Sequence, residues 1–356
     1  MDKFRAEISH VKLPPRVLPF VVGDNLEALE QQPEDLSKNP VKFANLQSSE
    51  GEEFHFRRVC NGFSVKAFLG GGPGPDQQPE PAHKCHYLHH FDPRLRLGPF
   101  KIEVASADPY LIVIHEIFTE AEMDFIVRTS RPNLSRMREV PVENTRNARH
   151  EYKGGRKRRI VAKSVQHWIA DVEYEHLEED PMAPDDNWNY TIADPVMYKL
   201  SKKLEAATGL DITGKYSSTS YQTTNYGLGG LCETHIDPHG YIEGAELPYE
   251  RQMLVRSGDM FATIMGWMSD PPVGGATAFI KPMKEVTVWP TKGSAAFWYD
   301  LDRKGYRDLD TLHGGCPVLK GTKWILNKWI YYYNQWPKYT CSLEPREKVR
   351  GFKGLY

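Results

Sequence analysis

Three residues in the second half of the chain have the types and spacing of a metal site. His235 and Asp237 stand two positions apart, so in an extended strand their side chains point to the same face. His313 is the best candidate for a third ligand. Two imidazoles and one carboxylate on one face of a metal, with the other positions open, are typical of non-haem Fe(II) oxygenase sites. The His-x-Asp pair alone also occurs by chance on protein surfaces, so it predicts little without the third ligand.

Short strands are the elements that must position these residues. β-prone runs alternate with turn signals such as Gly274-Gly275 and Gly314-Gly315. Many short strands in succession indicate a barrel or a jelly roll, whose open end can hold an ion. We expect an α+β fold with a double-stranded β-helix (jelly-roll) core flanked by helices. The predicted strands are two between residues 100 and 118, followed by 219–226, 260–268, 276–279, 286–289, 294–299 and 323–333.

Two helices have clear start signals. Thr119 and Glu122 form a capping box, with Phe118 and Met123 spaced for a hydrophobic staple, and this helix should end near Thr129. A second helix should begin at Asp194-Pro195 and end at Gly209, with an apolar stripe along one side. We also expect a short helix around Asn25 to Gln31.

The distribution of Pro, Gly and polar residues suggests four segments. We expect a polar N-terminal arm or domain remnant at 1–58, a disulfide-tied Gly/Pro-rich linker at 59–99, an ordered domain with the candidate metal ligands at 100–342 and a C-terminal tail at 343–356. The linker contains a loop at 70–82 that cannot hold a helix or a central strand.

Composition and charge exclude several functional classes. The formal net charge of −2 argues against a general polyanion binder, and no apolar run is long enough to span a membrane. The segment after Met1 has no apolar signal-peptide core, so the protein is either cytosolic as written or lacks its natural N-terminus. Basic residues gather between Arg146 and Lys163, where a solvated hairpin around Gly154-Gly155 is favoured over a nucleic-acid patch. We expect neither a nucleic-acid nor a membrane partner.

Five cysteines leave the redox compartment open. Proximity along the chain allows a Cys60–Cys85 pair and a Cys316–Cys341 pair, but five buried thiols fit the spacing equally well. Two glycosylation sequons, at Asn133 and Asn189, favour an oxidising compartment, although such triplets are common by chance.

Several further motifs accompany the three candidate ligands and Lys323 in a fixed order: Asn225 to Gly227, Gly274 to Thr277, Ala296 to Tyr299 and His313 to Val318. Together they closely resemble the catalytic domain of the collagen prolyl 4-hydroxylase alpha subunit. The resemblance covers roughly residues 100–342, and more weakly Cys60 to His90.

The resemblance implies a metal centre and a cosubstrate. His235, Asp237 and His313 would hold Fe(II), with 2-oxoglutarate, O2 and L-ascorbate completing the chemistry. Lys323 would neutralise the far carboxylate of 2-oxoglutarate, because a buried unpaired charge costs several kcal/mol. The implied activity is that of a procollagen-proline 4-dioxygenase, which hydroxylates proline at C4 in X-Pro-Gly peptides and converts 2-oxoglutarate to succinate and CO2.

Further roles follow from the same resemblance. Tyr226, Thr277 and Trp298 would contact the cosubstrate, although each could equally be a core residue. The family pattern pairs Cys316 with Cys341. It leaves Cys232 without a partner, as a thiol close to the iron, and the triad is complete without His239.

The resemblance also concerns partners and location. It implies a proline-rich, collagen-like peptide substrate, the lumen of the endoplasmic reticulum, and protein disulfide isomerase as a beta subunit. Residues 1–58 show no counterpart of the family's dimerisation region or helical peptide-binding domain, which leaves that assembly open. The alternatives are a related 2-oxoglutarate dioxygenase acting on a non-collagen peptide and a non-catalytic binding subunit.

Overall fold

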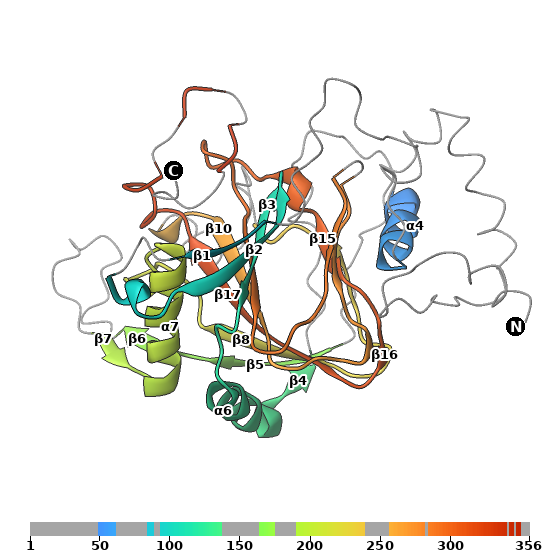
Figure 1. The fold of residues 1–356 in the computed structure, drawn as a ribbon, viewed down its shortest axis with the longest axis horizontal. Helices are drawn as coiled ribbons and strands as arrows, with labels where there is room; N and C mark the ends of the chain where they lie inside the picture. Colours follow the sequence, from blue (N-terminus) through green and yellow to red (C-terminus); the bar gives the residue numbers. More distant parts are fainter. Residues whose placement is uncertain are drawn as a thin grey trace, which may run out of the picture.

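Two antiparallel sheets pack face to face and form the core of the protein (Figure 1). The computed structural model describes residues 49–61, 84–88, 93–136, 164–174, 190–238, 256–281, 284–339, 342–344 and 347–349. In spatial order the nine strands of the large sheet are β1 (Lys84–Leu88), β2 (Phe100–Ala107), β3 (Tyr110–His115), β14 (Ala295–Tyr299), β10 (Met260–Trp267), β17 (Lys323–Tyr331), β8 (Tyr221–Tyr226), β5 (Val165–Ile169) and β4 (Ser135–Arg136).

The small sheet carries the two histidines of the candidate metal site. Its four strands, in spatial order, are β13 (Val286–Val288), β12 (Thr277–Phe279), β15 (His313–Gly315) and β9 (Cys232–His235). Two further pairs are β11 (Val273–Gly274) with β16 (Val318–Lys320), and β6 (Val172–Tyr174) with β7 (Tyr190–Ile192). This double sheet is the predicted jelly roll.

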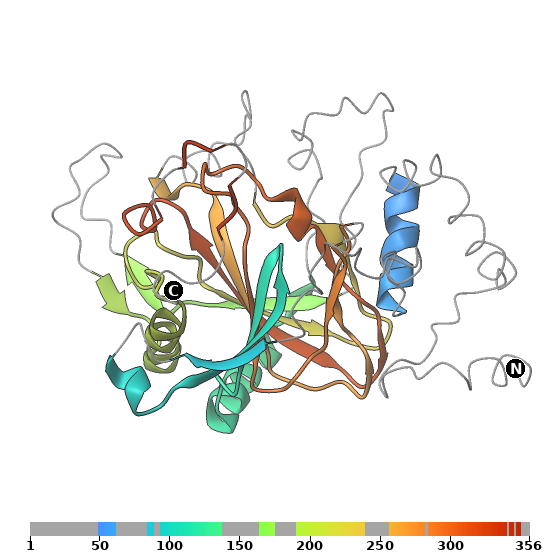
Figure 2. The same cartoon turned by 45° about the horizontal axis from the view of Figure 1, so that its top comes forward.

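Helices cover the outer faces of both sheets, so the protein has four layers (Figures 1 and 2). Helices α6 (Glu120–Ser130) and α7 (Pro195–Thr208) pack their apolar sides on the large sheet. Helix α4 (Ser49–Cys60) packs on the small sheet. Short 3-10 turns are η1 (Pro93–Arg96), η2 (Arg131–Asn133) and η4 (Leu309–Thr311).

The two predicted helix starts are confirmed in atomic detail. The Thr119 hydroxyl accepts a hydrogen bond from the Glu122 backbone N–H, and the Glu122 carboxylate accepts one from the Thr119 N–H at 2.8 Å. At α7 the Asp194 carboxylate accepts from two backbone N–H groups, and Gly209 ends the helix with φ of 70°. A glycine is favoured there because side chains strain a backbone with positive φ.

Strand prediction succeeded for the apolar runs and missed the shortest strands. Every predicted strand is present, with bounds that differ by a few residues. The missed strands include β9 and β15, which have four and three residues. Polar and glycine-rich segments of this length carry no periodic signal, and only pairing with a neighbour makes them strands.

The two predicted disulfides, Cys60 with Cys85 and Cys316 with Cys341, are wrong, because Cys60 and Cys316 are bonded to each other. These two cysteines form one disulfide, which ties the last residue of α4 to the segment after β15. Cys85 is a free, exposed thiol on β1, at the edge of the large sheet, and Cys341 lies outside the described residues. Proximity along the chain failed because α4 packs on the small sheet and brings distant cysteines together.

Helix α4 also crosses the expected boundary between an N-terminal arm and a linker, which was placed after residue 58. The expected helix at 25–31, the loop at 70–82 and the basic hairpin lie outside the described residues. Within the described ranges, no helix is long and apolar enough to cross a membrane.

Candidate metal centre

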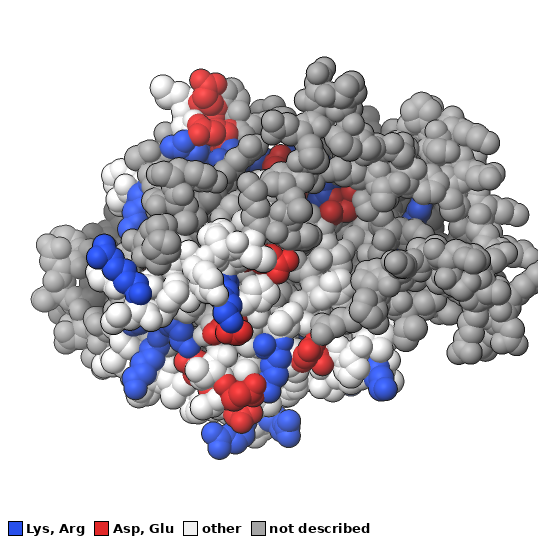
Figure 3. Space-filling view, viewed as in Figure 1, with Lys and Arg blue, Asp and Glu red and all other residues white. Residues whose placement is uncertain are grey.

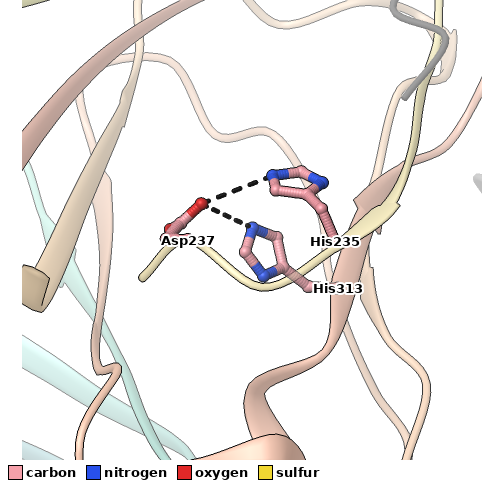
Figure 4. Close-up of side chains that lie close together, drawn as sticks. All are labelled: His235, Asp237 and His313. Carbon is pink, nitrogen blue, oxygen red and sulfur yellow. Dashed lines mark ion pairs between the residues drawn. The ribbon is translucent and has the colours of Figure 1, made fainter. Parts of the chain in front are cut away.

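The structure brings His235, Asp237 and His313 together at one end of the small sheet (Figure 4). Strand pairing sets His313 directly opposite His235, and Asp237 follows β9 by two residues. One ligand atom from each residue lies within 4.8 Å of the others. Nε2 of His235 and Nε2 of His313 lie 3.4 Å and 3.8 Å from the same Asp237 oxygen, Oδ1.

Backbone carbonyls orient both imidazoles. Nδ1 of His235 lies 2.8 Å from the carbonyl oxygen of Glu233, and Nδ1 of His313 lies 2.8 Å from that of Thr311. A protonated Nδ1 donates to the carbonyl and leaves the Nε2 lone pair free for a metal, as is usual for metal-binding histidines. Two Nε2 atoms and one carboxylate that converge in this way fit Fe(II).

The protonation states of the triad largely suit a cation. Burial alone would raise the pKa of Asp237, but the neighbouring imidazoles and the Thr263 hydroxyl hold it well below its usual range. Burial lowers the pKa of His313 to about 4, so this imidazole is neutral. Burial opposes protonation of His235 too, but Cys232 and Asp237 raise its pKa well above the ordinary value. A bound metal must therefore displace a proton from His235.

Asp237 has a second partner that the sequence did not reveal. The Thr263 Oγ1 lies 2.7 Å from Oδ2 of Asp237 and 2.7 Å from Oδ2 of Asp300. A hydroxyl has one proton to donate, so one of the two carboxyl groups must carry a proton of its own. Burial, with the charge on Asp237, raises the pKa of Asp300 well above its usual range. A protonated Asp300 thus donates to Thr263, which donates to the Asp237 carboxylate.

Lys323 lies buried beside two of the residues that the sequence grouped with it. It begins β17, is 2% exposed, and its Nζ lies 3.4 Å from Thr277 Oγ1 and 5.5 Å from the centre of the Tyr226 ring. Burial lowers the pKa of Lys323 to about 8, and its charge is close enough to depress the pKa of His313. Among the described residues no carboxylate forms an ion pair with it. This buried cation is suited to receive an anionic group.

The other predicted site residues lie in different surroundings. Trp298 is 1% exposed and meets the His313 ring edge-on at 4.9 Å, so it contacts a candidate ligand. Cys232 is a free buried thiol whose Sγ lies 3.8 Å from Nδ1 of His235. Asn133 is exposed in η2, with its side-chain amide donating to a backbone carbonyl, whereas Asn189 and His239 lie outside the described residues.

Two tryptophans beside the site were also missed. Trp329 stands directly opposite Thr263 in the large sheet, so both side chains share the face toward the small sheet. The Trp168 ring on β5 lies 6.0 Å from the Trp329 ring and is 44% exposed. No acceptor among the described residues reaches the Trp329 indole N–H. Only the sheet register, which joins β5, β8, β17 and β10, shows that these residues are neighbours of the metal site.

Charges of both signs lie on the part of the surface that Figure 3 shows. Lysine and arginine alternate with aspartate and glutamate on the face shown in Figure 3, without a large patch of one sign. The charges on this face therefore do not indicate a binding site for a polyanion.

Comparison with known proteins places this geometry in context. Residues 221–331 match the family model of the 2OG-Fe(II) oxygenase superfamily. Prolyl 4-hydroxylase subunit alpha-3 of Bos taurus is 33% identical over 276 residues, which are 78% of this chain and 43% of the relative. Subunit alpha-1 of Rattus norvegicus is 31% identical over 256 residues, covering 72% of this chain and 41% of the relative. The chain spans less than half the length of these curated relatives.

A solved structure shows a weaker likeness. The viral collagen prolyl hydroxylase of Paramecium bursaria Chlorella virus-1, in its 2OG complex, is 21% identical with a TM-score of 0.41. The match covers 63% of this chain and 98% of the viral one.

Proposed function

We propose, from its 2OG-Fe(II) oxygenase domain at residues 221–331, that this chain hydroxylates proline at C4 in collagen-like X-Pro-Gly peptides. The reaction would be coupled to oxidative decarboxylation of 2-oxoglutarate to succinate and CO2. The observation that carries the proposal is the convergence of His235, Asp237 and His313 beside the buried Lys323 ammonium group, which forms no ion pair with a described carboxylate.

The three converging residues would hold Fe(II). A bound Fe(II) would supply the activation of dioxygen, coupled to oxidation of a 2-oxo acid. The protein's own contribution is position and charge. The Glu233 and Thr311 carbonyls hold the imidazole rings, and Thr263 fixes the carboxylate of Asp237.

Lys323 would bind the far carboxylate of 2-oxoglutarate. An anion beside its Nζ converts a costly isolated charge into a hydrogen-bonded ion pair. The Thr277 hydroxyl and the Tyr226 ring border the same ammonium group and would contact the same end of the cosubstrate. We assign Trp298 to the wall that shields His313 from water, because its ring packs on that imidazole.

The aromatic pair Trp168 and Trp329 supports a proline-rich substrate. Proline-rich segments adopt a polyproline II conformation, which recognition domains bind in grooves lined by aromatic rings. The pair begins next to Thr263, which contacts the metal-site carboxylate. A peptide lying on both rings would therefore run past the candidate iron.

The proposal also includes a reductant, a cellular compartment and a partner subunit. We include L-ascorbate as the reductant that keeps iron ferrous. The Cys60–Cys316 disulfide supports an oxidising compartment such as the endoplasmic reticulum lumen. Glycosylation at Asn133 and Asn189 would fit that compartment. Assembly with protein disulfide isomerase is proposed only because the relatives are named alpha subunits.

The test is a coupled assay. The protein is incubated with Fe(II), ascorbate, 2-oxoglutarate and a (Pro-Pro-Gly) repeat peptide, and both succinate and the gain of one oxygen atom by the peptide are followed. We expect both products from the wild type and neither from His235→Ala or His313→Ala. Succinate without peptide oxidation would favour a dioxygenase with another peptide substrate. A folded wild-type protein that binds no metal would instead be a non-catalytic binding subunit.

A further inference from the structure

Helix α4 packs beside the small sheet (Figures 1 and 2), where it contacts β9 and β12 and reaches β15 through the Phe56 side chain. The helix ends at Cys60, far before these strands in the chain and outside the matched oxygenase domain. Its Phe56 ring packs on the backbone of Gly314, the residue after His313, so closely that a Cβ at Gly314 would lie 2.8 Å from the ring. Glycine at this position lets the helix approach the strand.

A second contact reaches the other histidine strand. The Thr234 hydroxyl, next to His235, donates to the Glu52 carboxylate at 2.6 Å. Glu52 and Phe56 stand four residues apart and therefore on the same side of α4. One face of the helix thus contacts the neighbours of His235 and His313 at the same time.

The histidine strands need such support because their own pairing is limited. Strand β9 is the edge strand of the small sheet, has four residues and pairs only with β15 among the described strands. The β9–β15 register also shifts between His313 and Gly315. Short, irregular edge pairing fixes the strand positions weakly.

Two further interactions hold α4 in place. The Cys60–Cys316 disulfide joins the end of the helix to the segment after β15. Phe56 and Val59, 6% and 2% exposed, pack with Ala276, Ala278 and Ile280 of the small-sheet layer. The helix is therefore anchored both covalently and by a small apolar core.

We propose that α4 is a positioning element of the metal centre. It fixes β9 against β15 and so sets the separation of the His235 and His313 imidazoles. This inference rests on the proposed function, because it requires that the triad binds a metal. Glu52 and Phe56 act through the strands and do not touch the metal.

The experiment measures Co(II) affinity of the full chain by calorimetric titration, with Co(II) as a divalent probe that does not require turnover. Changes in residues that support metal ligands typically weaken affinity about 10- to 100-fold. We expect roughly a tenfold rise in the Co(II) dissociation constant for Phe56→Ala and Glu52→Ala. Glu52→Gln should keep wild-type affinity, because the amide oxygen can still accept from Thr234.

A matched control separates positioning from general loss of stability. Leu204→Ala also removes a buried apolar side chain, but from α7 on the outer face of the large sheet. It should change Co(II) affinity by less than about twofold, since distant sites are independent. Circular dichroism and denaturant unfolding confirm that each variant is folded during the titration. Glu52→Ala, which leaves the apolar core of α4 intact, keeps the test valid if Phe56→Ala does not fold.

The outcomes distinguish the two proposals. If the wild type binds Co(II) and Glu52→Ala binds it equally well, the positioning role of α4 is wrong while the metal site stands. If Leu204→Ala lost as much Co(II) affinity as the α4 variants, the positioning role of α4 would also be wrong, because the loss of affinity would then reflect a general loss of stability. If the folded wild type binds no divalent metal, the proposed function fails, and the role of α4 fails with it.

Discussion

Replacing Lys323 with methionine should stabilise the cosubstrate-free protein and remove 2-oxoglutarate binding. Burial lowers the pKa of Lys323 from its ordinary 10.5 to about 8, with no ion pair among the described residues to offset the desolvation. At about 1.4 kcal/mol per pKa unit, the buried ammonium costs the folded protein roughly 3 kcal/mol at neutral pH. Methionine has a similar length and no charge, so it removes this cost while filling the same space.

The stability cost of the buried Lys323 ammonium group decreases as the pH rises. The folded pKa lies below the unfolded one, so between about pH 8 and 10.5 the unfolded chain binds more protons, and wild-type stability rises with pH. The cost is fully present below pH 8 and disappears as the pH approaches 10.5. The stability advantage of Lys323→Met should therefore be largest at pH 7 and should shrink across this window.

The assay is denaturant unfolding of metal-free protein at pH 7 and pH 9.5 in a buffer without carboxylates or phosphate. Calorimetric titration with 2-oxoglutarate in the presence of Co(II) measures cosubstrate binding. Lys320→Met is the matched control, since Lys320 is an exposed lysine on β16 and should change stability by less than about 0.5 kcal/mol. If Lys323→Met lowered stability at pH 7, or bound 2-oxoglutarate as tightly as the wild type, the role assigned to this lysine would be refuted.

Three further predictions follow from single contacts. Thr263→Val keeps the side-chain shape but removes the hydroxyl that donates to Asp237, so Co(II) affinity should fall about 10-fold or more in the calorimetric titration. Unchanged affinity would contradict the role of Thr263 in orienting the Asp237 carboxylate. Thr119→Ala removes the N-cap of α6 and should lower the free energy of unfolding, measured by urea denaturation, by about 1 kcal/mol. A decrease below about 0.3 kcal/mol would show that the cap contributes little to stability. Non-reducing peptide mapping should recover a fragment that joins Cys60 to Cys316, and recovery of Cys60 joined to Cys85 would show that the pairing is wrong.

Local signals in the sequence determined the elements whose partners lie close along the chain. The capping box at Thr119 and the Asp194-Pro195 start each define a helix end by contacts within a few residues, so they could be predicted. The long strands β10 and β17 were predictable for a similar reason, because strands that are largely buried are rich in apolar and aromatic residues. The candidate ligands could also be named, since few residue types bind iron and the surrounding motifs occur in a known order.

Tertiary structure alone decided how distant segments meet. The pairing of Cys60 with Cys316, the Thr263–Asp300 contact and the Trp168–Trp329 pair all join residues whose proximity depends on sheet register and layer packing. Helix α4 is the strongest example, because its contact with both histidine strands follows only from the place it takes on the small sheet. Sequence therefore specified which groups could perform the chemistry. The fold specified their separations and protonation, because burial and neighbouring charge depend on contacts between residues far apart in the chain.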